Sequence, residues 1–201
     1  MNEPNSNREI NKDLRRHPLG EAAKLDGGRV RLRFVRAYPH SVQRVWQALT
    51  DPAETEKWWA RSRGSLRAGS SFDLQWLNAK DEGHGTEMDW WNGRVLACDP
   101  PQLFEFSNTM HGTIRMELSS EAVGPVQEGT RLVFTNVISA PDEVVLMSLA
   151  GWHTHLDHLQ EALAGRSVDW PHWWDDLYPS WERIHADYTA AHPGLADVAD
   201  G

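Results

Sequence analysis

The stretch EVVLMSLAGWHTHLDHLQEAL, residues 143–163, decides the fold of this chain. Its apolar residues recur at alternating steps of four and three, as on one face of an α-helix: Val145, Leu149, Trp152, Leu156, Leu159 and Leu163. Pro141 and Asp142 precede the stretch and Gly165 follows it, so the sequence predicts one helix of about 22 residues. Because the upstream segments are predicted mostly as strands, we expect this helix to lie across a sheet and cover its apolar face.

The composition indicates a single globular domain of ordinary size. The chain has 201 residues, of which 40% are hydrophobic and 24% charged, and eleven are tryptophan. Its formal net charge of −9 argues against nucleic-acid binding, and we find no apolar run long enough for membrane insertion. Cys98 is the only cysteine and the first residues have no apolar signal segment, so we expect a reducing, cytoplasmic location.

The sequence predicts a folded domain over residues 28–166, preceded by a flexible polar arm over residues 1–27. The domain begins with the strand RVRLRFVRA, in which apolar residues alternate with arginine. Two short helices follow, and DPAE at 51–54 opens the second, which we expect to end at WW, 58–59. The period then returns to two and predicts an antiparallel meander, in which residues 86–99 form one long strand.

Residues 167–201 form an aromatic-rich extension that contains a short predicted helix. Trp181, Ile184 and Tyr188 lie at helical spacing within it. Because exposing so many large aromatic residues favours association, we expect the extension to cover the domain or to pack against a second subunit. The sequence therefore does not decide between a monomer and a homodimer.

Four motifs, in this order, resemble the START-like (SRPBCC) superfamily and within it the branch homologous to the activator of Hsp90 ATPase. They are VWQALTDPAETEKWW (45–59), GRVLACDPPQLFEF (93–106), GTRLVFTN (129–136) and AGWHTHLDHLQEALAG (150–165). The resemblance spans nearly the whole chain from Val30 to Gly165.

The resemblance implies an α+β helix-grip fold. In this fold a curved antiparallel sheet of six to seven strands surrounds the long C-terminal helix, and two short helices follow the first strand. The cavity between sheet and helix typically holds a lipid, a polyketide or another apolar small molecule. The resemblance therefore implies a bacterial ligand-binding protein, with a chaperone ATPase-activating cofactor as an alternative.

Standard catalytic motifs are missing from the sequence, which has no GxSxG, HExxH, CxxC or Walker loop. Cys98 is interpreted as a small buried apolar residue. His155 and His158 share one face of the long helix, which we expect to face solvent, and two ligands do not make a metal site. We therefore expect no metal and no cofactor, and a binding module rather than an enzyme.

Three polar residues remain candidates for chemistry in the cavity. His153 and Asp157 are four residues apart, so they can pair on the helix, and His153 at the edge of the apolar stripe can turn toward the cavity. The resemblance often places a carboxylate at the position of Glu105. Together the three either act as acid and base, as in a cyclase, dehydratase or hydrolase, or form a buried network that fixes the helix to the sheet.

The expected ligand-binding residues combine aromatic and aliphatic side chains with two polar groups. They are Trp59, Phe72, Leu74, Trp76, Trp90, Trp91, Phe104, Glu105, Phe134, Leu149, Trp152 and His153. Packing of a tryptophan-rich core explains the same aromatic residues equally well. The uncertain register around Gly93 leaves open which of Trp90 and Trp91 faces inward.

Overall fold

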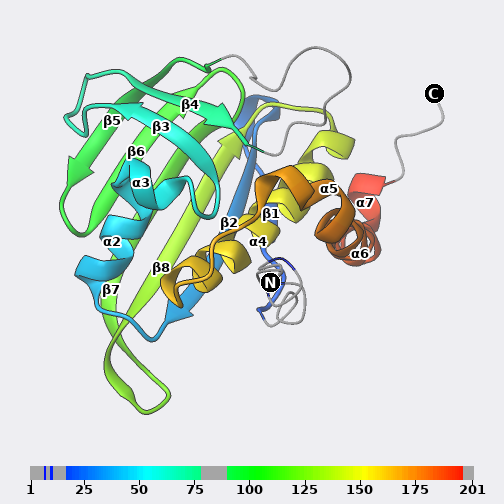
Figure 1. The fold of residues 1–201 in the computed structure, drawn as a ribbon. Coiled ribbons are helices and arrows are strands. Elements are labelled where there is room, and N and C mark those ends of the chain that lie inside the picture. The colour runs from blue at the N-terminus through cyan, green and yellow to red at the C-terminus, as the bar shows by residue number, and fades with distance from the viewer. Residues whose placement is uncertain (1–6, 8–9, 11–16, 78–89, 197–201) are drawn as a thin grey trace.

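A six-stranded antiparallel sheet curves around the long helix α4 (Asp142–Leu163) in the computed structural model (Figure 1). The model describes residues 7, 10, 17–77 and 90–196. In spatial order the strands are β1 (Glu21–Lys24), β2 (Val30–Tyr38), β8 (Val126–Ile138), β7 (Gly112–Val123), β6 (Leu103–Asn108) and β5 (Gly93–Asp99). The predicted α+β architecture with a curved antiparallel sheet and a long C-terminal helix is confirmed.

Alternation of apolar and polar residues determines which face of the sheet meets α4. In β2, Leu32 and Phe34 are buried, whereas Arg31 and Arg33, which alternate with them, lie on the outer face. Phe34 stands opposite Phe134 of β8, and their rings pack edge to face with centroids 6.0 Å apart. The inner face is therefore lined with aromatic rings that pack against the helix.

The strands β3 (Ala60–Gly64) and β4 (Phe72–Trp76) form a separate two-stranded ladder. Beside β5, the isolated bridges Ser71–Arg94 and Leu74–Trp91 join this ladder and its flanking residues to β5 and the residues before it. The predicted long strand 86–99 is shorter than expected, because β5 begins at Gly93, where a Cβ atom would lie 2.4 Å from a backbone oxygen of β4. Residues 86–89 lie outside the described residues.

Two short helices connect β2 with β3, as expected. Ser41 caps α2 (Val42–Thr50) by accepting the N–H of Arg44, and Asp51 caps α3 (Pro52–Thr55) by accepting the N–H of Ala53. The predicted end of the second helix at Trp58–Trp59 is wrong, because α3 ends at Thr55 and a hydrogen-bonded turn follows.

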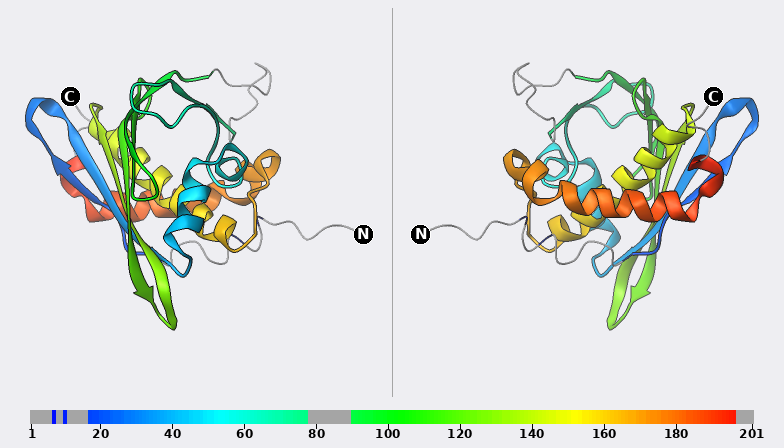
Figure 2. Two further views of the ribbon diagram at one scale, coloured as in Figure 1. Left: turned by 90° about the vertical axis from the view of Figure 1, so that its left-hand side faces the viewer. Right: turned by 90° about the vertical axis from the view of Figure 1, so that its right-hand side faces the viewer.

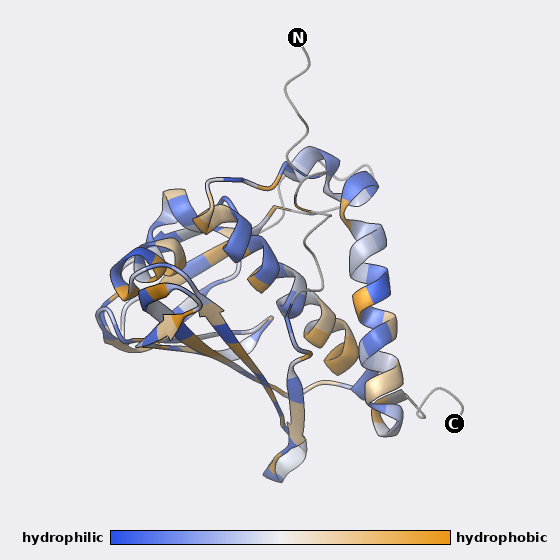
Figure 3. Cartoon of the chain, turned by 90° about the horizontal axis from the view of Figure 1, so that it is seen from below, coloured by the Kyte–Doolittle hydropathy of each residue, from blue (hydrophilic) through white to orange (hydrophobic). Residues whose placement is uncertain are grey.

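The helix α4 is buried on nearly all sides. All six apolar residues of its stripe are at most 6% exposed, which confirms the predicted contact with the sheet. The opposite side of α4 is covered by α6 (Tyr178–Ala191), as the two views of Figure 2 show. Seen from below in Figure 3, α6 carries mostly hydrophilic residues with a few apolar ones between them. The helix α4 therefore forms a middle layer between the sheet and the C-terminal extension.

The C-terminal extension packs on the domain, as predicted. It contains η2 (Trp170–His172), α5 (Trp173–Asp176), α6 and α7 (Pro193–Ala196). Ile184 and Tyr188 of α6 join the main core at 1% and 0% exposure, and Trp173 is buried in a smaller cluster beside it. The aromatic residues of the extension thus find their partners within the same chain.

The predicted flexible arm over residues 1–27 is wrong in its last part, because Glu21–Lys24 form β1 and pair with β2. The strand β1 covers backbone groups that β2 would otherwise expose at the sheet edge. The N–H of Gly20 also donates to the hydroxyl of Tyr188 at 2.6 Å, so the start of β1 is joined to α6. In the part of the chain that the structure describes, none of the helices is long and apolar enough to cross a membrane.

Candidate functional site

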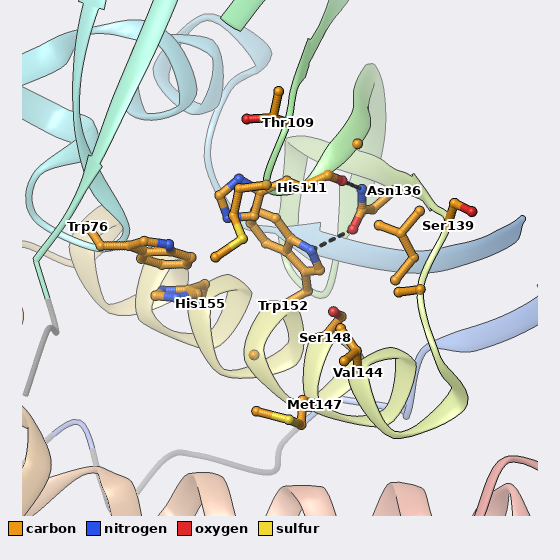
Figure 4. Close-up of a pocket in the computed structure, with 15 residues that line it drawn as sticks. Trp76, Thr109, His111, Asn136, Ser139, Val144, Met147, Ser148, Trp152 and His155 are labelled. Atoms are coloured by element: carbon orange, nitrogen blue, oxygen red, sulfur yellow. Dashed lines mark hydrogen bonds between the residues drawn. The ribbon is translucent and has the colours of Figure 1, made fainter. Parts of the chain in front are cut away.

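A cavity of about 450 Å³ opens between the first half of α4, the end of β8 and the turn that joins β6 to β7 (Figure 4). Its volume is within the range of small-molecule pockets. Its lining is mainly apolar: Trp76, Thr109, Met110, His111, Gly112, Asn136, Ile138, Ser139, Ala140, Val144, Met147, Ser148, Gly151, Trp152 and His155. This cavity is the candidate site.

Three large apolar side chains of the lining remain accessible to solvent. Met110 is 55% exposed, Met147 46% and Val144 42%. Large apolar side chains that are exposed together commonly mark a place where a ligand or partner binds. Methionine in particular adapts to ligands of different shape, because its side chain is unbranched and flexible.

A buried asparagine fixes the position of the Trp152 indole. Asn136 of β8 accepts the indole N–H of Trp152 at 2.9 Å, and its amide nitrogen donates to the carbonyl oxygen of His111 (Figure 4). The same amide nitrogen also donates to the carbonyl oxygen of Thr113. Asn136 is 1% exposed, so its hydrogen bonds form away from water. Helix, sheet and the β6–β7 turn are thereby held together at the cavity.

His111 lies in the turn between β6 and β7, among tryptophan rings. The centroid of its imidazole is 5.2 Å from the Trp76 ring, 5.4 Å from Trp91 and 5.7 Å from Trp152. Its Nδ1 lies 3.1 Å from Oδ1 of Asn108. Burial lowers the pKa of His111 to about 3, so the ring is neutral at physiological pH.

His155 of α4 is buried in the cavity wall at 4% exposure. Its Nδ1 lies 3.2 Å from the carbonyl oxygen of Trp58, and burial lowers its pKa to about 4. His158, one turn further along, is 0% exposed, and burial lowers its pKa well below the ordinary value. The prediction that both rings face solvent is wrong, because Trp170 of the C-terminal extension packs over them with ring centroids 6.3 Å away.

His153 points away from the cavity, contrary to the prediction. Its Nδ1 is 2.9 Å from the hydroxyl of Tyr188 in α6, and its Nε2 is 3.5 Å from a carboxylate oxygen of Asp157. Each residue turns about 100° around a helix, so when Trp152 faces the sheet, His153 faces α6. Burial, followed by the charge of Arg36, lowers its pKa to about 3. His153 and Asp157 thus belong to a buried polar network between α4 and α6.

Glu105 lies on the outer face of the sheet, where it forms an ion pair with Arg115 at 2.7 Å. Its neighbours Phe104 and Phe106 are both 0% exposed and point inward, so alternation along the strand places Glu105 outside. The predicted convergence of Glu105 with His153 and Asp157 is therefore wrong, since the sheet and α4 separate them.

Of the predicted ligand-binding residues, Trp76 and Trp152 line the cavity. The uncertainty around Gly93 is resolved by two ring contacts: Trp91 faces inward, 5.4 Å from His111, whereas Trp90 lies under the Arg63 guanidinium at 4.1 Å. The other predicted apolar residues are buried in the core instead of lining the cavity: Trp59, Phe72, Leu74, Phe104, Phe134 and Leu149.

Several residues of the cavity were not expected from the sequence. Of these residues, Gly151 had the clearest signal in the sequence, since a glycine in the middle of a long helix is unfavourable and commonly has a packing reason. A Cβ atom at Gly151 would meet nothing within 4 Å, so the glycine leaves space in the cavity. His111 carried no signal, because it lies in a turn of ordinary composition.

Metal ligands are not gathered at the cavity or elsewhere among the residues for which the structure gives positions. Within those residues, no group of three or more His, Cys, Asp or Glu side chains is arranged to hold an ion. The residues that line the cavity offer apolar contact, ring stacking and hydrogen bonding.

Comparison with known proteins gives one family and several similar structures. The family model for activator of Hsp90 ATPase homolog 1-like proteins matches residues 39–164. The crystal structure of CalU16 from Micromonospora echinospora has a TM-score of 0.62 and 23% identity, over 89% of this chain and 98% of that one. No curated protein matches the sequence significantly.

Two further solved structures are similar over almost their full length. A conserved protein of unknown function from Enterococcus faecalis, EF2215, has a TM-score of 0.61 and 16% identity, over 96% of this chain and 99% of that one. The protein encoded by BPP1335 of Bordetella parapertussis has a TM-score of 0.61 and 24% identity, over 94% of each chain. These likenesses concern the fold, a sheet that curves around a long C-terminal helix.

Proposed function

The chain belongs to the family of activator of Hsp90 ATPase homolog 1-like proteins, in the START-like (SRPBCC) superfamily, and we propose that it binds an apolar small molecule in the cavity beside Trp152. The observation that carries the proposal is the cavity itself, with about 450 Å³ of space and a mainly apolar lining. Burial of a ligand's apolar surface there supplies affinity, and a few polar groups supply selectivity.

The fixed walls of the cavity support binding. The hydrogen bond between Asn136 and Trp152 and the stacking of His155 on Trp76 hold two large rings in place. A binding protein with such preformed walls loses little side-chain entropy when the ligand enters. The indole rings also offer flat surfaces on which a ring of the ligand can stack.

Catalysis by His153, Glu105 and Asp157 loses its support, because Glu105 lies on the outer face of the sheet and His153 contacts α6. The third alternative, activation of a chaperone ATPase, rests on the family's description alone.

We also propose a cytoplasmic location, since a chain with Cys98 as its single cysteine has no internal disulfide that would favour an oxidising compartment.

Native mass spectrometry of freshly purified protein tests the proposed function. We expect the wild-type protein to carry a small apolar molecule and Gly151→Phe to lack it, because the new ring enters the space that Gly151 leaves. Ala186→Phe, on the exposed side of α6, is the matched control and should keep the molecule. Equal adducts on wild type and Gly151→Phe, or none on either after incubation with apolar aromatic compounds, would contradict the proposal.

A further inference from the structure

The hydrogen bonds of His111 determine which of its ring nitrogens carries the proton. Oδ1 of Asn108 accepts the backbone N–H groups of Met110 at 3.1 Å and of His111 at 2.7 Å, so this atom is an acceptor. The ring Nδ1, 3.1 Å from the same atom, must therefore donate. A neutral imidazole has a single N–H, which leaves Nε2 of His111 as an acceptor. This atom is buried and has no hydrogen-bond partner among the described residues.

The hydrogen bond of His155 likewise determines which of its ring nitrogens carries the proton. Its Nδ1 lies 3.2 Å from the carbonyl oxygen of Trp58, which can only accept. Nδ1 therefore carries the N–H, and Nε2 is left with a lone pair. The ring is held in this orientation because it also stacks on Trp76 in the cavity wall. Two histidines of the lining thus each keep an acceptor nitrogen.

Both rings stay neutral, so both nitrogens remain acceptors at physiological pH. Burial lowers the pKa of His111 to about 3 and that of His155 to about 4. The second influence on His111 is the charge that His155 would carry, so protonation of one ring opposes protonation of the other. Protonation of both rings at once is therefore unfavourable.

The remaining polar groups of the cavity do not favour an anion. The amide of Asn136 and the indole N–H of Trp152 already bond within the protein. The hydroxyls of Thr109, Ser139 and Ser148 can donate or accept. None of the described residues that line the cavity is lysine or arginine, so a carboxylate would lose its water without gaining a counter-charge.

We propose that His111 and His155 select a neutral ligand that carries a hydrogen-bond donor, such as a phenolic hydroxyl, and disfavour its carboxylate analogue. The inference rests on the proposed function and names the chemical class of ligand that this cavity takes. The donor of the ligand bonds to a ring nitrogen of the cavity wall that accepts no hydrogen bond from the described residues, while the aromatic walls hold the apolar body.

Three naphthalene probes of one ring shape test this selectivity by isothermal titration calorimetry at pH 7. They are 2-naphthol, which donates a hydrogen bond, 2-methoxynaphthalene, which only accepts, and 2-naphthoate, which is an anion. We expect 2-naphthol to bind about three- to tenfold more tightly than 2-methoxynaphthalene, the range of one net hydrogen bond, and 2-naphthoate to bind most weakly.

The outcomes of the probe series are distinguishable. Equal affinities for 2-naphthol and 2-methoxynaphthalene, or tightest binding of 2-naphthoate, would overturn the selectivity and leave the proposed function standing. Binding of none of the probes, or binding that Gly151→Phe does not reduce, would overturn the proposed function together with the inference.

Ring-preserving variants assign the selectivity to the two histidines. His111→Phe and His155→Phe keep the aromatic shape but remove the acceptor, so each should reduce the ratio of the 2-naphthol affinity to the 2-methoxynaphthalene affinity. His172→Phe, at an exposed position of η2, is the matched control and should keep the full preference. An unchanged preference in both cavity variants would overturn the assignment. Circular dichroism confirms folding, and the wild-type probe series decides the question if a variant does not fold.

Discussion

The imidazole of His155 stacks on the indole of Trp76, with ring centroids 5.1 Å apart and an interplanar angle of 27°. This contact joins α4 to β4 across the wall of the cavity, as Figure 4 shows. Because Nδ1 of His155 also bonds to the carbonyl of Trp58, the ring is held by two separate segments of the chain. The wall of the candidate site is therefore rigid although β4 does not belong to the main sheet.

Gly151 should tolerate a methyl group and even gain from it. Alanine in place of glycine inside a helix stabilises by about 0.5–1 kcal/mol, and a Cβ atom at this position meets nothing within 4 Å. We therefore expect Gly151→Ala to raise the free energy of unfolding in urea by that amount. Destabilisation by Gly151→Ala would mean that the space beside α4 is filled.

His153→Ala should affect folding and leave ligand affinity unchanged, since His153 contacts Tyr188 and Asp157 instead of the cavity. Removing a buried hydrogen-bonding ring is expected to cost roughly 1–3 kcal/mol of unfolding free energy. Urea denaturation and calorimetry with 2-methoxynaphthalene measure the two effects separately. A loss of affinity without a loss of stability would place His153 at the binding site after all.

Acid should destabilise the protein well above the pKa of its carboxylates. Burial lowers the pKa of His153 and His155 from the ordinary 6.5 to about 3 and about 4, so the unfolded state binds more protons than the folded state between these values. Stability is then fully present above pH 6.5 and falls as the pH drops toward 4. Each of the two rings should lower the free energy of unfolding by about 1 kcal/mol between pH 6.5 and 5.5, as measured by urea denaturation at both pH values.

A matched variant attributes this pH dependence to a particular ring. His155→Phe removes one titrating group, so the loss of stability between pH 6.5 and 5.5 should be about 1 kcal/mol smaller than in the wild type. His172→Phe, which removes an exposed imidazole, should not reduce it. A flat stability profile in the wild type across this interval would contradict the burial of neutral histidines.

Truncation after Gly165 should weaken the domain. It removes α6, whose Ile184 and Tyr188 are buried against the core, and it uncovers His158. Burial of such side chains stabilises by about 1.5–3 kcal/mol each, so we expect the melting temperature to fall by at least about 5 °C or the chain to associate. Differential scanning calorimetry and light scattering measure both. An unchanged melting temperature and mass would mean that the extension contributes nothing to the fold.

The fold could be predicted where local pattern and packing agree. The stripe from Val145 to Leu163 follows the helical period and is buried as expected, and the residue type and position of Asp51 predicted the start of the second short helix. The burial of His158 could not be predicted, because it depends on Trp170, which the fold brings over α4 from a later part of the chain. Helical periodicity describes one apolar face and says nothing of a second layer.

The site could be predicted only in part, for related reasons. Trp76 and Trp152 follow from strand and helix periodicity, whereas Glu105, expected in the cavity, lies on the outer face of the sheet because Phe104 and Phe106 point inward. The acceptor nitrogen of His111 depends on a turn conformation in which Asn108 gathers three hydrogen bonds. Such an arrangement has no periodic signature in the sequence.

The eleven tryptophans provide the most direct test, because they report from separate parts of the molecule. In a nitrogen-15 NMR spectrum of the indole N–H groups, we expect 2-methoxynaphthalene to shift the signals of Trp76 and Trp152, which line the cavity, and of their neighbour Trp91. The signals of Trp173 and Trp174 in the C-terminal cluster should not move. Shifts confined to the C-terminal cluster, or no shift at saturating probe, would contradict the account that the cavity beside Trp152 is the ligand-binding site.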